Sequence, residues 1–308
     1  MSLLEVRGLT VRDALTGALI VRDVHFCLEP GTCLGVVGES GSGKSLTCLA
    51  LLGLAPPSLR VSGSVRFGGI DLLQAGRETV RGIRGKRIAM IVQQPMTAFD
   101  PLYSMGAQLL ETLRATTSAF SEKESRGRIV EALEMMHIHN PLDVLKKYPY
   151  QLSGGMLQRC MIAVALLQRP DIIIADEPIS ALDMSIRAQV LNLLRRLQKE
   201  RGITYLFIAH DLSVMRYISD RIAVIHKGDI VELADAEELV THAIHPYTRS
   251  LLSAIPMPNP RLERKKKLLV YDPAMHDYSK EAPQWRQLRP NHFVLCSAAE
   301  AEQWSKEV

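Results

Sequence analysis

The pattern of apolar and polar positions changes character several times along the chain. The first 37 residues contain alternating or short apolar runs around the turn EPGT, namely LEVRGLTV, LIVRDVHFCL and CLGVV. Such runs between turn residues are typical of strands. We therefore expect strands in this region, followed by a glycine-rich turn, an apolar helix over LTCLALLGL, and a further hairpin over VSGSVRFGGIDLL.

Residues 100–150 show helical spacing instead, as in AQLLETLRATT and RGRIVEALEMM. After Pro170 the apolar runs DIIIAD and TYLFIAH return, with the helical segment IRAQVLNLLRRLQKERG between them. Short uninterrupted apolar runs are typical of central parallel strands that are covered on both faces. The pattern predicts an α/β core interrupted by a helical insert. From about residue 236 the composition becomes proline-rich and then basic, which indicates a small appended module.

The overall composition is that of an ordinary globular protein, with 47% hydrophobic and 23% charged residues. No apolar run approaches the ~18 residues that a membrane-spanning helix needs. The start, MSLLEVRGLTV, lacks the basic and then apolar pattern of a secretory signal. We therefore expect a cytosolic protein that reaches a membrane through a partner.

The cysteines and basic residues suggest no chemistry of their own. The five cysteines lie far apart without a CxxC pair, so we expect buried, reduced thiols. The net charge of +4 is small for 308 residues. The basic run RLERKKK (261–267) contains no interleaved aromatic residues, which favours a solvated segment over binding to nucleic acid or acidic lipid.

The segment GESGSGKS matches G-x-x-x-x-G-K-[ST] and lies between an apolar strand and an apolar helix, the context that such a phosphate loop requires. Glycines let the backbone wrap around phosphates with N–H groups pointing inward, and the helix adds its positive end. Lys44 would neutralise the β- and γ-phosphates and the Ser45 hydroxyl would bind Mg²⁺. A chance glycine turn is the alternative. The predicted nucleotide-binding residues are Gly38, Glu39, Ser40, Gly41, Ser42, Gly43, Lys44 and Ser45.

Three further apolar runs end in polar residues that suit ATP hydrolysis. DIIIADEP ends in Asp176, which would hold Mg²⁺, and Glu177, which would orient or deprotonate water. His210 in LFIAHD would contact the γ-phosphate, and Gln93 in IAMIVQQP would reach the metal or the attacking water. Each residue alone has an ordinary structural interpretation, such as a solvated strand end. The phosphate loop makes the catalytic interpretation preferable.

Taken in order, GESGSGKS, VQQP, LSGGM, IIIADEP, SALD and IAHD resemble the motifs of ATP-binding subunits of ABC transporters, over essentially the whole chain. The resemblance implies an α/β fold with a P-loop ATPase core. It assigns residues 1–97 and 159–235 to a RecA-like core with an antiparallel β subdomain. Residues 98–158 would form the helical signature subdomain, and 236–308 a small C-terminal extension.

The same resemblance implies that LSGGM acts on another chain. In a head-to-tail dimer, Ser153, Gly154 and Gly155 would contact the γ-phosphate of ATP held by the other subunit, and Asp183 in SALD would lie at the interface. The segment around Gln93 would receive a coupling helix from a transmembrane partner. Met156 replaces the usual glutamine of the motif, a change that agrees with the peptide/nickel branch of importers.

Other segments favour the same branch. SGGMLQR and AFDPLYSM resemble nickel-type importer subunits, whereas VELADAEEL, HPYTRSLLSAIP and RPNHFVL resemble oligopeptide importer subunits. The resemblance implies ATP-driven import of peptides or of nickel or metal chelates, with ATP and Mg²⁺ as cofactors. The implied partners are a second, paralogous ATPase subunit, two permease subunits and, indirectly, a solute-binding protein. The implied location is the cytoplasmic face of the bacterial inner membrane.

Two other functions compete with this interpretation. A soluble ABC ATPase of translation or DNA repair would usually have two cassettes or a long coiled-coil insertion, whereas this chain has one phosphate loop and a short insert. A small-molecule kinase would leave LSGGM without a role. Two features depart from many ABC relatives: residues 1–25 contain no aromatic side chain to stack on adenine, and Cys296 alone in the tail predicts no iron–sulfur cluster.

Overall fold

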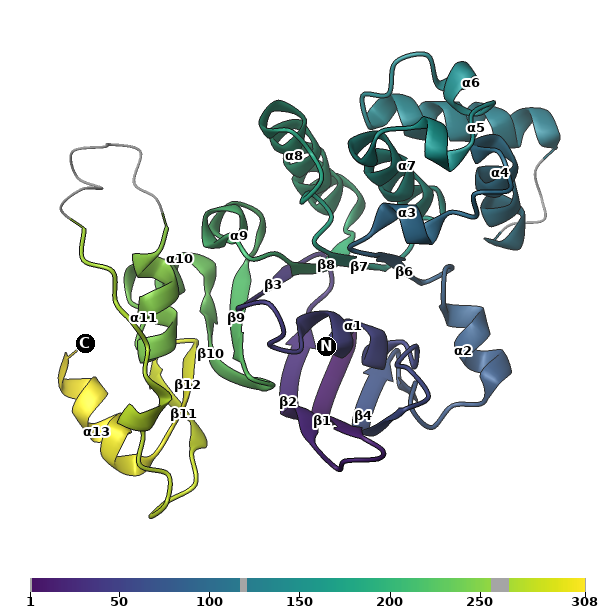
Figure 1. The fold of residues 1–308 in the computed structure, drawn as a ribbon. Coiled ribbons are helices and arrows are strands. Elements are labelled where there is room, and N and C mark those ends of the chain that lie inside the picture. The colour runs from purple at the N-terminus through teal and green to yellow at the C-terminus, as the bar shows by residue number, and fades with distance from the viewer. Residues whose placement is uncertain (1, 117–120, 256–265, 308) are drawn as a thin grey trace. The chain divides into compact units, whose positions relative to one another are not determined.

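The computed structural model describes residues 2–116, 121–255 and 266–307, drawn as a ribbon in Figure 1. The chain divides into two compact units. We call the first the signature unit and the second the phosphate-loop unit. The signature unit contains Glu29–Thr32 and Gln74–Phe207, and the phosphate-loop unit contains Ser2–Leu28, Cys33–Leu73 and Ile208–Val308.

The phosphate-loop unit contains an antiparallel sheet with the strand order β2-β1-β4-β5. Along β1 the apolar side chains are buried, and the polar ones between them are exposed or half-buried, as the alternating pattern predicts. The β4–β5 hairpin, with Phe67 opposite Ile70, confirms the hairpin predicted from the sequence. The strands are β1 (Leu4–Asp13), β2 (Leu19–Leu28), β4 (Leu59–Phe67) and β5 (Ile70–Asp71).

A second group of strands in this unit follows the order β11-β12-β10-β9-β3. The fully buried strand β3 runs parallel to β9, with Val37 opposite Val224. Because β10 pairs with both β9 and β12, the C-terminal strands continue the sheet that holds β3 (Figure 1). The strands are β3 (Cys33–Val37), β9 (Arg221–His226), β10 (Asp229–Asp235), β11 (Gln284–Arg289) and β12 (His292–Cys296).

The predicted C-terminal extension contains its own small core, formed by Ile244, Val294, Cys296 and Trp304. The boundary of the extension at residue 236 stays a prediction, because β12 pairs directly with β10. The helices of the phosphate-loop unit are α1 (Lys44–Leu51), α9 (Leu212–Ile218), α10 (Ala236–Thr241), α11 (Pro246–Ser253) and α13 (Ala298–Glu307), with a 3-10 turn at Pro273–Met275.

The signature unit combines parallel strands with a helical segment. Its strand order is β8-β7-β6, and β6 runs parallel to β7 with Ile91 opposite Ala175. The described residues between 92 and 171 form helices and turns without a strand, which confirms the helical character predicted for this stretch. The strands are β6 (Ile88–Ile91), β7 (Ile172–Asp176) and β8 (Thr204–Ile208). The helices are α2 (Arg77–Ile83), α3 (Pro95–Ala98), α4 (Met105–Thr116), α5 (Glu122–Met135), α6 (Pro141–Val144), α7 (Gly154–Leu167) and α8 (Met184–Arg201), with a 3-10 turn at Pro149–Gln151.

Local sequence explains where several of these helices begin and end. Helix α5 begins with a capping box, in which Ser121 and Glu124 satisfy each other's backbone N–H groups. Asp183 caps α8, whose far end stops at Gly202 in the left-handed conformation (φ 66°) that glycine adopts readily. These caps satisfy backbone donors and acceptors that helix ends leave unpaired.

One expectation about the cysteines is wrong. Cys33, Cys48, Cys160 and Cys296 are buried, but Cys27 is exposed because it lies on the outward face of β2 between buried neighbours. Most of the basic run 261–267 lies outside the described residues. Within the described parts of the chain, no helix is both long enough and apolar enough to cross a bilayer.

Candidate nucleotide site

Strand β3 leads directly into the predicted phosphate loop, and α1 begins at Lys44. Gly43 caps α1 with a φ of 101°, a left-handed conformation that side chains disfavour. Gly38 is required for a different reason: a Cβ there would lie 2.2 Å from the carbonyl oxygen of Ile225 on β9. The two glycines therefore allow the tight turn and the close approach to the neighbouring strand that the loop needs.

Lys44 is nearly buried, at 7% exposure, and its side chain folds back over the loop. Its Nζ donates to the carbonyl oxygens of Gly38 at 2.8 Å and Glu39 at 2.7 Å. It also lies 3.4 Å from the hydroxyl oxygen of Ser42. The loop thus holds a cationic group beside the backbone N–H groups at the start of α1, an arrangement suited to binding an anion. Glu39 and Ser40 are exposed and Ser45 is half-buried.

Strand β7 is buried along its whole length and ends at Asp176, which is 4% exposed. The next residue, Glu177, has a φ of 48°, a left-handed conformation that is rare for a residue with a long side chain. Backbone outliers of this kind cost free energy and gather at functional sites. The turn therefore supports a functional role for Glu177.

The sequence reasoning missed Gln158, which is fully buried within α7. Its Nε2 donates to the carbonyl of Glu177 at 3.0 Å, and its Oε1 accepts from the N–H of Ala181 at 3.1 Å. The signature helix is thereby tied to the turn that carries Glu177. The signal for this residue was a polar side chain in a largely apolar helix, three positions after Gly155.

The predicted signature residues lie at the N-terminus of α7. Ser153 caps the helix, accepting from the N–H of Met156 at 3.3 Å, and both Ser153 and Gly154 are exposed. A Cβ on Gly154 would meet no heavy atom within 4 Å, whereas one on Gly155 would lie 3.2 Å from the carbonyl oxygen of Ala181. Packing within the chain therefore explains a glycine at 155 but leaves Gly154 unexplained.

Asp183 begins α8 and serves as its N-cap. Its Oδ1 accepts from the N–H of Ile186 at 3.0 Å and from the Ser185 hydroxyl at 2.7 Å. These hydrogen bonds lower the pKa of the Asp183 carboxyl, so it is charged at neutral pH. The adjacent Met184 is exposed at 86%, so the turn before α8 presents both a charge and an apolar side chain to the outside.

The two remaining candidates both follow strands and are exposed. Gln93 comes two residues after β6, and His210 comes two residues after β8. Asp211 follows His210 and caps α9 by accepting from the N–H of Ser213 at 2.8 Å. Sequence reasoning thus placed both residues correctly at strand ends, although their contacts with a nucleotide stay predictions.

The candidates divide between the two units of the chain. Gly38–Ser45 and His210 belong to the phosphate-loop unit, and Gln93, Ser153–Gly155, Asp176, Glu177 and Asp183 belong to the signature unit. The oxygens of the Ser45 hydroxyl, the Asp176 carboxylate and the Gln93 amide are the hard donors that Mg²⁺ prefers. The donor set therefore fits a magnesium ion chemically.

Two family models match the chain. The model described as "ABC transporter" matches residues 21–180. The model described as "Oligopeptide/dipeptide transporter, C-terminal region" matches residues 231–280. The first match covers the phosphate loop, the signature motif and the end of β7, and the second covers α11 within the extension.

The chain is similar to curated proteins along nearly its full length. It is 44% identical over 310 residues, 99% of each chain, to "Oligopeptide transport ATP-binding protein OppF" of Streptococcus pyogenes serotype M1. It is 43% identical over 288 residues, 92% of each chain, to the OppF protein of Bacillus subtilis. To "Metal-staphylopine import system ATP-binding protein CntD" of Staphylococcus aureus it is 43% identical over 253 residues, 82% of this chain and 93% of that protein.

A solved structure supports the fold. The ATP-binding cassette MJ0796, described as a dimer in a post-hydrolysis state bound to ADP and Pi, superposes with a TM-score of 0.69 at 28% identity. The match covers 76% of this chain and 98% of that one. The expected α/β fold of an ABC ATPase, with its antiparallel subdomain and C-terminal extension, is confirmed.

Proposed function

The chain belongs to the ABC transporter family as an ATP-binding, ATP-hydrolysing subunit, and from this premise we propose that it powers the import of oligopeptides or dipeptides. The observation that carries the proposal is similarity over 99% of both chains to an oligopeptide transport protein. The match of residues 231–280 to the oligopeptide/dipeptide C-terminal region supports it independently. Import of a metal chelate is the second candidate, favoured by the 43% identity to a metal-staphylopine import protein.

We assign the chemistry of ATP hydrolysis to the strand ends and the loop. Gly38–Ser45 bind the phosphates, and the Lys44 ammonium neutralises their charge. Ser45, Asp176 and Gln93 would hold Mg²⁺, which would stabilise the charge on the phosphate oxygens when bound. Glu177 accepts a proton from the attacking water, and His210 contacts the γ-phosphate. The strained backbone of Glu177 supports its assignment as the base.

We further propose that each ATP is enclosed by two chains. Ser153, Gly154 and Gly155 would contact the γ-phosphate held by a second ATPase subunit, a paralogue of this chain, and Asp183 would lie at the interface. The exposed helix N-terminus at Ser153 and Gly154 supports this role, because its N–H groups favour an anion. That Gly154 has no packing role within its own chain supports it as well.

The proposed membrane partners are two permease subunits, served by a solute-binding protein. The chain would bind them peripherally at the cytoplasmic face of the bacterial inner membrane. Large apolar side chains shortly after Gln93 support a docking surface there: Met96, Leu102 and Tyr103 are 53%, 79% and 59% exposed. Where such side chains form one contiguous patch, the patch is typical of an interaction site.

An uptake experiment tests the proposed cargo. In a strain lacking the gene, we expect loss of uptake of a radiolabelled tetrapeptide, restored by this chain but not by its Glu177→Gln variant. Uptake of chelated Ni²⁺ is measured in the same strains. Loss of nickel uptake with normal peptide uptake would favour the second candidate, and normal uptake of both would contradict the import proposal.

A further inference from the structure

The phosphate loop is hydrogen-bonded to the C-terminal extension. The backbone N–H of Glu39 donates to the hydroxyl oxygen of Tyr247 at 3.0 Å, although the two residues are 208 positions apart. Tyr247 belongs to α11, in the segment HPYT. The loop therefore makes a direct contact with a part of the chain that none of the proposed catalytic roles uses.

The peptide group held by Tyr247 is also held by Lys44. The N–H of Glu39 and the carbonyl of Gly38 belong to the same planar peptide unit. That carbonyl accepts from the Lys44 Nζ at 2.8 Å, and the Glu39 carbonyl accepts from the same amine at 2.7 Å. The tyrosine hydroxyl and the lysine ammonium thus bind opposite edges of one peptide group. Such linked hydrogen bonds polarise and strengthen one another.

Tyr247 itself is firmly placed. Its side chain is 1% exposed, and its ring lies 4.2 Å from the ring of His226 and 5.4 Å from that of Tyr271, measured between centroids. His226 ends β9, the strand that runs parallel to β3 beside the loop. Burial raises the pKa of Tyr247 to about 12, so its hydroxyl keeps its proton at neutral pH.

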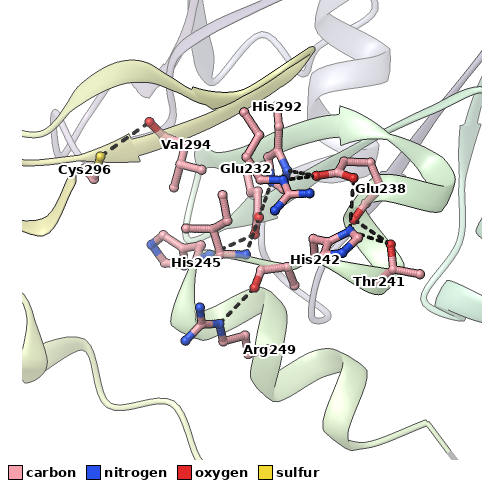
Figure 2. A network of polar contacts seen from close by, with 12 residues as sticks. Glu232, Glu238, Thr241, His242, His245, Arg249, His292, Val294 and Cys296 are labelled. Atoms are coloured by element: carbon pink, nitrogen blue, oxygen red, sulfur yellow. Dashed lines mark hydrogen bonds and ion pairs between the residues drawn. The ribbon is translucent and has the colours of Figure 1, made fainter. Parts of the chain in front are cut away.

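The backbone around Tyr247 is fixed by a buried polar network, part of which is seen in Figure 2. The N–H of Tyr247 donates to Nδ1 of His245 at 3.1 Å. The N–H groups of Ile244 and His245 donate to the carboxylate of Glu232 at 2.7 and 3.1 Å, and His292 contacts the same carboxylate at 2.7 Å. Because Glu232 lies on β10 and His292 on β12, two paired strands of the sheet hold the segment that carries Tyr247.

We propose that Tyr247 is a positioning residue of the nucleotide site: its hydroxyl fixes the Gly38–Glu39 peptide and, through it, the Lys44 amine. The extension thereby holds the loop in a binding-ready conformation before ATP arrives. Pre-organisation of this kind increases affinity because less ordering is required on binding. The inference rests on the proposed nucleotide site and adds a role for the extension.

The test compares Tyr247→Phe with Tyr271→Phe in the full-length chain. Both variants remove one hydroxyl from the same aromatic cluster, but only the first hydroxyl contacts the loop. We expect Tyr247→Phe to weaken ATP binding about three- to tenfold, the effect of one net hydrogen bond. In the assembled transporter the KM for ATP should rise by the same factor. The kcat at saturating ATP should change less than about twofold, because bound phosphates then hold Lys44.

Hydrogen exchange of the loop amides gives a second measurement that is independent of activity. The Glu39 amide should exchange faster in Tyr247→Phe than in the wild type or in Tyr271→Phe, with comparable melting temperatures for all three. Unchanged Glu39 exchange, or equal weakening of ATP binding by both variants, would overturn the inference. ATP binding by Lys44→Ala is measured alongside. Normal ATP binding by Lys44→Ala would show that the proposed nucleotide site is wrong. Normal ATP binding by Tyr247→Phe, with binding lost in Lys44→Ala, would contradict only the positioning role.

Discussion

The side-chain amide of Gln158 donates to the backbone carbonyl of Glu177 at 3.0 Å and accepts from the N–H of Ala181 at 3.1 Å. The signature helix α7 and the turn that follows β7 are therefore one hydrogen-bonded assembly. In the proposed mechanism α7 faces the ATP of another chain, whereas Glu177 acts on the ATP of its own chain. The buried side chain of Gln158 thus connects the helix proposed to contact one ATP with the turn proposed to act on a second ATP.

Replacing Gln158 with leucine should both destabilise the fold and impair catalysis. The N–H of Ala181 would lose its side-chain partner, whereas the Glu177 carbonyl would keep its bonds from the N–H and hydroxyl of Ser180, so we expect a cost of about 1 kcal/mol. We expect a lower midpoint of urea unfolding and a reduced kcat, because the Glu177 turn is no longer held in place. Gln168→Leu is the matched control, since Gln168 lies at the other end of α7 and its Oε1 makes no hydrogen bond to any described residue. Wild-type kcat in a folded Gln158→Leu variant would contradict the positioning role.

Glu177→Gln should separate ATP binding from ATP hydrolysis. The amide preserves shape but cannot accept a proton, and loss of a general base typically slows a reaction about 10²–10⁴-fold. We expect near-normal ATP affinity, turnover reduced at least about 100-fold, and accumulation of an ATP-bound dimer in size-exclusion chromatography. Glu200→Gln, an exposed change on α8, serves as the control. Turnover at the wild-type rate would show that another residue is the base.

Gly154→Asp should change stability and activity in opposite directions. A Cβ at this position would meet no heavy atom within 4 Å beyond the adjacent helix backbone, and an acidic residue in the first turn favours a helix by about 0.3–1 kcal/mol. In the proposed dimer the same carboxylate would repel the γ-phosphate of the other subunit. We expect an unchanged or higher melting temperature, normal ATP binding by the variant chain, and loss of transporter ATPase activity.

Gly154→Asn distinguishes charge from size at the same position. It should retain more ATPase activity than the aspartate variant, because it lacks the negative charge. Equal ATPase activity of Gly154→Asp and the wild type in the assembled transporter would rule out the contact in trans. Loss of ATP binding by the isolated variant chain would instead show that Gly154 acts on its own nucleotide.

The buried pair of Glu232 and His292 predicts a pH dependence of stability. Burial opposes a charged imidazole, but the hydrogen bonds and negative charges of Glu232 and Glu238 outweigh it and raise the pKa of His292 above its ordinary value of 6.5. With a raised folded-state pKa, the stability from this pair is complete below pH 6.5. It is lost as the pH rises through the folded-state pKa.

The melting temperature of the wild type should therefore decline more steeply above about pH 6.5 than that of His292→Gln. Scanning calorimetry across that range checks the expectation. His25→Gln, at an exposed histidine on β2, should decline as the wild type does. Equal slopes for the wild type and His292→Gln would mean that the pair contributes no pH-dependent stability.

The sequence predicted those structural features that depend on residues close together along the chain. The phosphate loop follows from glycines and a lysine between a strand and a helix, and the structure places Gly38, Gly43 and Lys44 as that pattern requires. The helical character of the insert follows from its apolar spacing. Resemblance to a known family added a prediction that spacing cannot supply, namely that LSGGM acts on another chain.

Contacts between distant residues could not be predicted in the same way. The exposure of Cys27 depends on which face of β2 is covered, and the apolar run around it does not show this. The pairing of β12 with β10, which makes the extension part of the sheet, joins segments with no shared motif. Neither follows from local propensity, because each depends on tertiary packing.

The sequence by itself determined which chemistry is proposed for this protein, because the groups assigned to bind phosphate and activate water are recognisable from residue type, spacing and the end of a strand. Only the tertiary structure decided what holds those groups in place. Gln158 supports the Glu177 turn and Tyr247 supports the phosphate loop through hydrogen bonds between residues remote in the chain. The physical reason is that hydrogen bonds and burial depend on distance in space, whereas a motif records only distance along the chain.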